Sequence, residues 1–152
     1  EATYQINHQS RVNTAILAKD SGVQRYILPS SCSIYGFQEE GHIAHEDSKT
    51  KPLTTYAKAN EMAERSILQL SDSTFCVTVL RQATVYGYSP RMRFDLSVNM
   101  LTFQALKNRR ITVFGGKQTR PNIHMNDMVR VYKHFINNPK IVMSNLSKFN
   151  SE

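Results

Sequence analysis

The fold of this 152-residue chain is decided by the stretch Arg25-Tyr26-Ile27-Leu28-Pro29-Ser30-Ser31-Cys32-Ser33-Ile34-Tyr35-Gly36. Its centre, Tyr26–Leu28, is short and apolar, which is typical of a strand buried in a parallel sheet. The predicted strand runs directly into a serine-rich turn. Because open parallel sheets bind ligands outside the carboxyl ends of their strands, these serines stand where a site is expected.

Helical and strand-like segments alternate on both sides of this stretch. The spacing of apolar residues predicts helices over Glu1–Ser21, Tyr56–Leu70, Leu96–Lys107 and from Asn126 or Asp127 to about Asn137. Apolar runs predict strands at Arg25–Pro29, Phe75–Leu80, Ile111–Phe114 and Lys140–Met143, and Phe37–Pro52 reads as a loop. Thr54 or Thr55 is a good N-cap residue, and Gly22 a plausible C-cap. This alternation predicts an α/β fold with a parallel sheet and flanking helices.

The charge of the chain is uneven along its length. Residues 1–76 carry 7 Lys and Arg against 9 Asp and Glu, a net charge of −2, whereas residues 77–152 carry 12 against 3, a net charge of +9. Together they give the formal net charge of +7. A basic half suggests an anionic partner, either nucleic acid or a sugar diphosphate. The basic residues are not interleaved with aromatic residues as in a stacking groove, which argues against nucleic acid.

The remaining composition predicts a cytoplasmic globular protein. Hydrophobic residues make up 40% of the chain, yet no run of about 18 apolar residues occurs, so no membrane span is expected. The first thirteen residues are polar and mixed, unlike a signal peptide. Cys32 and Cys76 lack the spacing of metal ligands and are expected to be reduced thiols.

Four motifs follow one another along the chain. They are Ser30-Ser31-Cys32-Ser33-Ile34-Tyr35-Gly36, Tyr56 at a helix start, Leu80-Arg81 leading to Tyr86-Gly87, and Arg120-Pro121-Asn122-Ile123-His124-Met125-Asn126-Asp127. In this order they resemble the extended short-chain dehydrogenase/reductases, which include NAD-dependent nucleotide-sugar epimerases and dehydratases. The resemblance extends from Asn7 to about Phe135.

This resemblance implies a partial Rossmann-like sheet plus part of a smaller substrate-binding region. Residues 1–87 would form the second half of the Rossmann-like domain with the serine–tyrosine site. Residues 88–152 would bind the nucleotide-sugar and interleave with the sheet. The implied cofactor is NAD or NADP, but the chain contains no G-x-G-x-x-G turn. We therefore expect the chain to correspond to a C-terminal half, with a missing N-terminal half, association with another copy, or a rearranged sheet.

The resemblance also implies which residues do chemistry. Ser31 would hydrogen-bond the oxygen at the reacting sugar carbon, with help from Ser33, although serines are also common in ordinary loops. Tyr56 would act as acid and base and contact the cofactor, its alternative being a structural role at a helix start. Asn7 matches an asparagine that organises a proton relay, or is a polar residue on a helix surface.

One position departs from the family pattern. The family carries a lysine four residues after the tyrosine, one helical turn away, whose charge favours the phenolate. Here the residue is Asn60, which could bond a ribose hydroxyl and so take part in the catalytic and cofactor site, but which brings no charge. Lys58 is about 200° around the helix from Tyr56 and points away from it. Base catalysis is therefore expected to be impaired.

Substrate binding is predicted in the basic half. Arg120 matches the family arginine that binds the substrate diphosphate, for which its bidentate donors are suited, and Asn99 matches an asparagine on the same group. Arg81 either faces the end of the sheet near the site or pairs with a carboxylate. His124 and Asp127 are interpreted as structural, with Asp127 near a helix N-terminus. No metal site is expected.

Two hypotheses therefore stand side by side. In the first, the chain belongs to an enzyme that acts on a nucleotide diphosphate-sugar by transient hydride removal. In the second, it is a non-catalytic remnant, a binding or structural module that keeps diphosphate binding. Asn60 and the absent glycine-rich turn favour the second hypothesis, and the four motifs favour the first.

Overall fold

The computed structural model describes residues 1–38, 41–116 and 119–138. The described residues form two compact units, which we treat separately: a first unit, Glu1–Gln82 with Asn138, and a second unit, Ala83–Asn137. The boundary at residue 83 lies close to the predicted one at residue 87. The assignment of the first part to the Rossmann-like domain and of the second to substrate binding stays a prediction.

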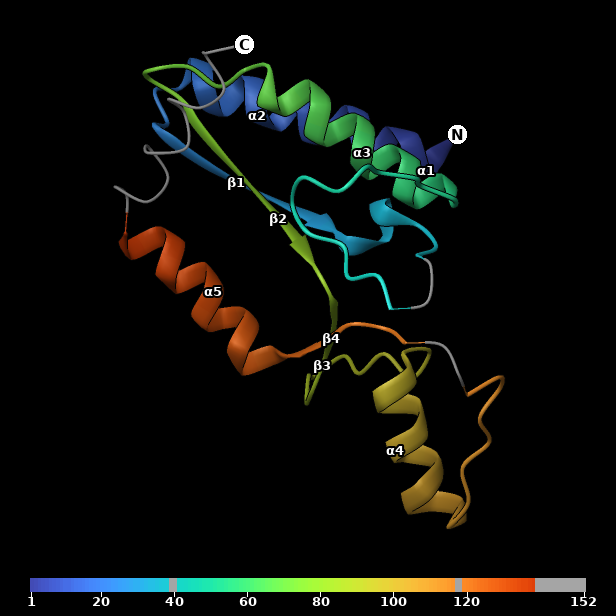
Figure 1. Ribbon diagram of the computed structural model, residues 1–152. Helices are drawn as coiled ribbons and strands as arrows, with labels where there is room; N and C mark the ends of the chain where they lie inside the picture. The colour runs from blue at the N-terminus through green and yellow to red at the C-terminus, as the bar shows by residue number, and fades with distance from the viewer. Residues whose placement is uncertain (39–40, 117–118, 139–152) are drawn as a thin grey trace. The chain divides into compact units, whose positions relative to one another are not determined.

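The first unit pairs two parallel strands and covers one face with helices (Figure 1). Strand β1 (Arg25–Ser31) pairs with β2 (Cys76–Gln82), with Leu28 opposite Val79 and Ser30 opposite Arg81. The predicted parallel arrangement is therefore confirmed. Because strand side chains alternate between faces, Leu28 and Ser30 share one face, and both are buried.

One helical span precedes β1. It consists of α1 (Ala2–Tyr4), a π-helical turn η1 (Gln5–Gln9) and α2 (Ser10–Asp20), so the prediction over Glu1–Ser21 is confirmed apart from its π-helical turn. Gly22 has a φ of +78°, the left-handed conformation expected just beyond a helix end. This helical span contacts α3 through η1, α1 and α2.

Helix α3 (Thr55–Leu68) is the second long helix of this unit. Thr54 is its N-cap and accepts a hydrogen bond from the Ala57 amide at 3.1 Å, as predicted. The buried core lies between this helix, α2 and the sheet, and comprises Ala15, Leu28, Ala63 and Ile67 with Val12, Tyr26, Leu70, Val77 and Val79 packed against them. Small alanine side chains allow the helices to lie close to the strands.

The second unit contains two very short parallel strands and two helices. Strand β3 (Thr84–Tyr86) pairs with β4 (Asn122–His124), and helix α5 (Met125–Asn137) contacts both strands. Helix α4 (Ser97–Asn108) confirms the prediction at Leu96–Lys107, and α5 confirms the one ending at Asn137. Three-residue strands carry no period that sequence could reveal, so β3 and β4 were not expected.

The predicted strand at Ile111–Phe114 is wrong. These residues are irregular, and Ile111, Val113 and Phe114 are all more than half exposed. The apolar run therefore lacks the neighbouring strand that its backbone would need for pairing among the described residues. The strand predicted at Lys140–Met143 lies outside the described residues.

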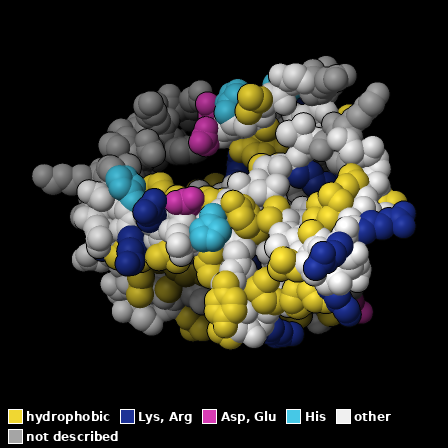
Figure 2. Space-filling model, turned by 90° about the horizontal axis from the view of Figure 1, so that it is seen from below, with side chains coloured by type: hydrophobic (Ala, Val, Ile, Leu, Met, Phe, Trp, Pro, Cys, Tyr) yellow, Lys and Arg dark blue, Asp and Glu magenta, His cyan; other side chains and the backbone are white. Residues whose placement is uncertain are grey.

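The surface is rich in apolar side chains. In Figure 2 they lie between scattered Lys and Arg side chains, with few acidic ones on that face. The large exposed apolar side chains of the second unit include Phe94, Phe103, Leu106, Ile111, Val113 and Phe114. Within the described part of the chain, no helix is both long and apolar enough to cross a bilayer.

A serine–tyrosine site with a guanidinium brace

The serine cluster lies at the carboxyl end of β1. Ser31 is the last residue of this strand, and its hydroxyl accepts a hydrogen bond from the Ser33 amide at 3.2 Å, which caps the 3₁₀ helix η2 (Cys32–Tyr35). An acceptor bond leaves the hydroxyl proton of Ser31 free to be donated. The Ser33 hydroxyl oxygen is itself buried and has no partner among the described residues.

The turn after the cluster is held by backbone geometry. Gly36 has a φ of +67°, and a Cβ added there would lie 2.0 Å from the carbonyl oxygen of Lys51. The Lys51 amide in turn donates to the Ile34 carbonyl at 2.9 Å. Glycine is therefore required at this position, and the following loop is fixed against η2.

Helix α3 brings the tyrosine to the same region. Tyr56 is the second residue of α3 and is 43% exposed, so it is accessible to a ligand. Helix α3 contacts both β1 and η2, the two elements that carry Ser31 and Ser33. The secondary structure thus brings the serine turn beside the helix of Tyr56, whereas contact between the Ser31 hydroxyl and the Tyr56 phenol stays a prediction.

Asn60 is placed differently from what the resemblance implied. Its side chain is fully buried, its Nδ2 donates to the Tyr56 carbonyl at 2.8 Å, and its Oδ1 accepts from Arg11 Nη1 at 2.7 Å. Both ends of the amide are therefore used inside the first unit. This arrangement argues against the predicted contact between Asn60 and a ribose.

Arg11 is a residue that the sequence interpretation missed. The same Nη1 atom also donates to the Pro29 carbonyl at 3.1 Å, so Arg11 joins α2 to α3 and to β1. It stands one helical turn after Asn7, and this i,i+4 spacing is the signal that could have revealed it. Among the described residues no carboxylate forms an ion pair with Arg11.

Asn7 lies in the π-helical turn η1, which contacts α3. Its Nδ2 donates to the Thr3 carbonyl at 3.1 Å, within the same helical span. The neighbouring His8 bonds the Ser66 hydroxyl at 3.2 Å and so ties η1 to α3. π-Helical turns occur frequently at functional sites, which agrees with the predicted role of Asn7 without testing it.

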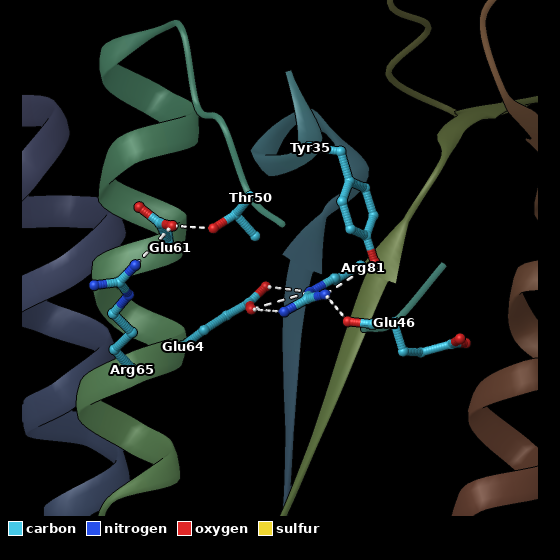
Figure 3. A network of polar contacts seen from close by, with 7 residues as sticks. All are labelled: Tyr35, Glu46, Thr50, Glu61, Glu64, Arg65 and Arg81. Atoms are coloured by element: carbon cyan, nitrogen blue, oxygen red, sulfur yellow. Dashed lines mark hydrogen bonds and ion pairs between the residues drawn. The ribbon is translucent and has the colours of Figure 1, made fainter. Parts of the chain in front are cut away.

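Arg81 is held by a partly buried network, drawn in Figure 3. Its guanidinium donates to both carboxylate oxygens of Glu64, at 2.9 to 3.3 Å, to the Tyr35 hydroxyl at 2.9 Å and to the Glu46 carbonyl at 2.9 Å. Of the two predicted alternatives for Arg81, pairing with a carboxylate is the one observed. Burial alone would lower the pKa of Arg81, but the bonds to Glu64 and Tyr35 outweigh it and raise that pKa. Arg81 thus fastens the loop after η2 to the sheet.

A second group of contacts in Figure 3 surrounds Glu61, which lies about one turn before Glu64 on α3. Glu61 accepts hydrogen bonds from the Thr50 hydroxyl and from Arg65, the latter at 3.1 Å (Figure 3).

Tyr56, Asn60 and Glu64 follow one another at intervals of four residues, so they form a stripe along α3. The two buried members of this stripe each receive a guanidinium, Asn60 from Arg11 and Glu64 from Arg81.

The predicted substrate residues lie in the second unit. Asn99 is its one buried residue among those described; its Oδ1 accepts from the Gly87 amide at 3.4 Å and its Nδ2 donates to the Arg93 carbonyl at 3.1 Å. The Arg120 side chain is exposed, and no hydrogen bond or ion pair to its guanidinium is found among the described residues. Whether Asn99 and Arg120 face the serine–tyrosine site stays a prediction.

His124 and Asp127 have structural contacts, as interpreted from the sequence. The His124 ring lies edge-on to Tyr86 with centroids 5.3 Å apart, and its Nδ1 accepts from the Asn126 amide at 3.3 Å. Asp127 lies in the first turn of α5 and pairs with Arg130 at 3.2 Å. A carboxylate in the first turn of a helix is favourable to the helix dipole.

Residues 1–145 match the model of the NAD dependent epimerase/dehydratase family. The chain belongs to this family. It is 33% identical over 132 residues to a UDP-glucuronate 4-epimerase of Thermodesulfobacterium geofontis, covering 82% of this chain and 38% of that protein. It is 27% identical to an uncharacterized UDP-glucose epimerase of Bacillus subtilis, covering 82% of this chain and 39% of the relative.

A solved structure of this kind supports the fold. The UDP-glucuronic acid 4-epimerase of Bacillus cereus, in complex with UDP-glucuronic acid and NAD, superposes with a TM-score of 0.78 at 25% identity. The match covers 91% of this chain and 43% of that one. The predicted Rossmann-like α/β fold is thereby confirmed. The chain spans about two fifths of the length of the curated relatives named above.

Proposed function

We propose that this chain supplies the catalytic and substrate-binding half of an NAD(P)-dependent nucleotide-sugar epimerase or dehydratase, in an impaired form. The observation that carries the proposal is the contact of α3, which bears Tyr56, with the strand end and 3₁₀ turn that bear Ser31 and Ser33. In a chain of this family, this contact supports the proposal that two groups capable of handling a proton act together near the carboxyl end of a parallel strand.

The residues of the first unit would act on the sugar. The Ser31 hydroxyl, whose oxygen already accepts from the Ser33 amide, donates its proton to the oxygen at the reacting carbon. Tyr56 takes the proton from the oxygen of the hydroxyl group on that carbon and later returns it. Without a lysine at position 60, the phenol lacks the charge that would favour its ionised form, which is the reason to expect an impaired enzyme.

The residues of the second unit would hold the diphosphate. The exposed guanidinium of Arg120 can donate two parallel hydrogen bonds to phosphate oxygens. Asn99 holds the backbone of Gly87 and Arg93, so it would shape the adjoining loop and use its remaining amide hydrogen for the ligand. A UDP-sugar is the substrate class that the named relatives suggest.

The fit of a dinucleotide to this chain is uneven. Tyr56 is exposed and suits a contact with the cofactor, whereas Asn60 is buried with its amide bonded and does not. When bound, the nicotinamide supplies the hydride chemistry. Because the sequence has no glycine-rich turn, we propose that dinucleotide binding requires further strands that carry such a turn, from an N-terminal half.

The surface of the first unit is compatible with such a completion. Among the described strands of this unit, β1 and β2 pair only with each other, so the outer edge of each has no strand partner. Ile16 and Leu17 on α2 are also exposed. Unpaired edges and exposed apolar groups favour association with further strands or chains.

The second candidate is a binding module without catalysis, which the buried Asn60 favours. Calorimetric titration with NAD and with UDP separates the two. Under the first proposal, both bind at roughly micromolar strength once the fold is completed; under the second, UDP binds and NAD does not. Arg120→Ala should weaken UDP binding by about tenfold or more, while the control Arg130→Ala, whose arginine pairs with Asp127, should not. Absence of UDP binding would remove the support for both.

A further inference from the structure

One cation among the described residues bonds the buried Asn60 side chain, and it comes from a different helix. Arg11 Nη1 lies 2.7 Å from Asn60 Oδ1 and 3.1 Å from the Pro29 carbonyl oxygen. Asn60 in turn donates to the Tyr56 carbonyl. A single guanidinium therefore connects the strand residue two positions before Ser31 with the first turn of the helix that presents Tyr56.

The hydrogen-bond partners of Arg11 are neutral acceptors. They are an amide oxygen and a backbone carbonyl, and no carboxylate of the described residues pairs with Arg11. The nearest acid along the α3 stripe, Glu64, already accepts from Arg81 with both of its oxygens. The charge of Arg11 also reaches β1: burial raises the pKa of Tyr26, and the positive charge of Arg11 opposes that rise.

We propose that Arg11 is a positioning residue that holds the Ser31 strand end against the Tyr56 turn and occupies the place of the lysine that the family motif puts at position 60. The lysine part of this inference rests on the proposed function. The family motif places a lysine on the helix that corresponds to α3. In this chain the cation is Arg11 on α2, and the Asn60 side-chain amide on α3 accepts a hydrogen bond from it.

A consequence follows for the obvious revertant. In Asn60→Lys alone, an ammonium would enter a fully buried position within reach of the Arg11 guanidinium, while Glu64, the acid of the α3 stripe, is already paired with Arg81. Two like charges in a buried layer repel each other. The single change should therefore damage the site, and a lysine at position 60 should be accepted only when the charge at position 11 is removed.

The experiment is a double-mutant cycle on the 152-residue chain. Asn60→Lys, Arg11→Gln and the combined variant are compared with wild type by thermal unfolding. We expect Asn60→Lys to lower the unfolding midpoint by roughly 5–10 °C, and the combined variant to unfold at a clearly higher temperature than Asn60→Lys. If Asn60→Lys lowers the unfolding midpoint equally with Arg11 and with Gln at position 11, or does not lower it at all, Arg11 does not occupy the place of the motif lysine.

Hydrogen exchange tests the positioning itself. Arg11→Gln should speed amide exchange around Ser31–Ser33 and at the start of α3, and Arg11→Lys should recover part of the protection because it restores the charge. The control is Arg65→Gln, which removes an exposed arginine on α3 and should leave both segments unchanged. Unchanged exchange in Arg11→Gln would overturn the positioning role, even if the Asn60→Lys variant failed to fold.

Neither measurement needs a ligand. If UDP and NAD fail to bind but the cycle is non-additive and exchange rises as expected, the proposed function fails and the positioning role of Arg11 stands. If UDP binds while Arg11→Gln leaves amide exchange in both segments unchanged, the positioning role of Arg11 fails and the proposed function stands.

Discussion

The two units of this chain differ in what holds them together. The buried apolar residues, among them Leu28, Ile67 and Phe75, all lie in the first unit, together with the buried Glu64 and Asn60. In the second unit Asn99 is the one buried residue among those described, and the amphipathic helix α5 has none. The first unit thus has a core of its own, and the second depends on backbone pairing and local contacts. Catalytic geometry is expected in the better-packed unit, because precise sites need rigid support.

Paired phenylalanine substitutions should give the largest contrast. Phe75→Ala removes a fully buried ring whose centroid lies 5.8 Å from that of Tyr26, and should lower the free energy of unfolding by about 3–5 kcal/mol. Phe103→Ala removes a ring that is 42% exposed, and should cost less than half as much. Chemical denaturation of each variant provides the comparison. Equal losses would contradict the difference in packing between the units.

Two arginine–carboxylate pairs provide the next test. Arg81→Ala leaves the nearly buried Glu64 carboxylate uncompensated and should cost about 3 kcal/mol of unfolding free energy. Arg93→Ala breaks an exposed pair with Asp95 in the second unit and should have a small effect. Glu64→Gln with Arg81→Ala should cost less than Arg81→Ala alone, since no charge is then left buried. A larger loss for Arg93→Ala would reverse the comparison.

Two glycines with positive φ separate backbone strain from close contact. Gly22→Ala introduces strain only, because nothing lies within 4 Å of the added Cβ, and should cost about 1 kcal/mol. Gly87→Ala adds the same kind of strain, and its Cβ would also lie 3.0 Å from His124 Nε2 and 3.4 Å from Met125 Cβ. It should cost about 1–3 kcal/mol and increase protease cleavage near β3. Equal losses of unfolding free energy in the two variants would show that the neighbours of Gly87 rearrange to accommodate the added methyl group.

The smallest expected effect concerns acid stability. The hydrogen bond from Lys19, followed by those from Thr74 and Phe75, holds the pKa of Asp72 well below its ordinary value. A lowered pKa in the folded state contributes stability above about pH 4, and this contribution is lost as the pH falls toward the folded pKa. Wild type should therefore exceed Asp72→Asn in unfolding temperature at about pH 6, and the gap should narrow at about pH 3.

Asp95 in the second unit is the matched case for Asp72. A hydrogen bond from Arg93 lowers its pKa as well, but these partners are two residues apart and can meet in the unfolded chain. Asp95→Asn should consequently change the acid stability less than Asp72→Asn does. A larger pH-dependent gap for Asp95→Asn would contradict this reasoning.

Much of the first unit could be predicted from the sequence. The apolar run before Ser31, the N-cap at Thr54 and the helical spacing of α3 are local signals, and each predicted the observed element. The strands β3 and β4 could not be predicted, because three residues show no periodicity and their pairing joins segments far apart in the chain. The strand predicted at Ile111–Phe114 was wrong for a related reason, because apolar residues form a strand only beside a partner strand.

The places of the candidate site residues in helices and strands were predictable, and their contacts less so. Ser31 and Tyr56 could be assigned by motif, since strand ends and helix starts fix their positions. The roles of Arg11 and Glu64 could not, because a long side chain reaches partners 49 and 17 residues away that no local pattern specifies. The bond from Arg11 engages the side-chain oxygen of Asn60 inside the protein, which no local pattern could reveal.

The central proposal is that Ser31 and Tyr56 act on the sugar of a nucleotide-sugar and that Asn99 and Arg120 bind a diphosphate. The most direct test is a titration of the isotope-labelled chain with UDP-glucuronic acid and with UDP, followed by amide resonances. We predict that the sugar nucleotide shifts the amides around Ser31 and Tyr56 as well as those around Asn99 and Arg120, and that UDP alone shifts only those around Asn99 and Arg120. Shifts confined to the second unit at saturating UDP-glucuronic acid, or none in either unit, would contradict it.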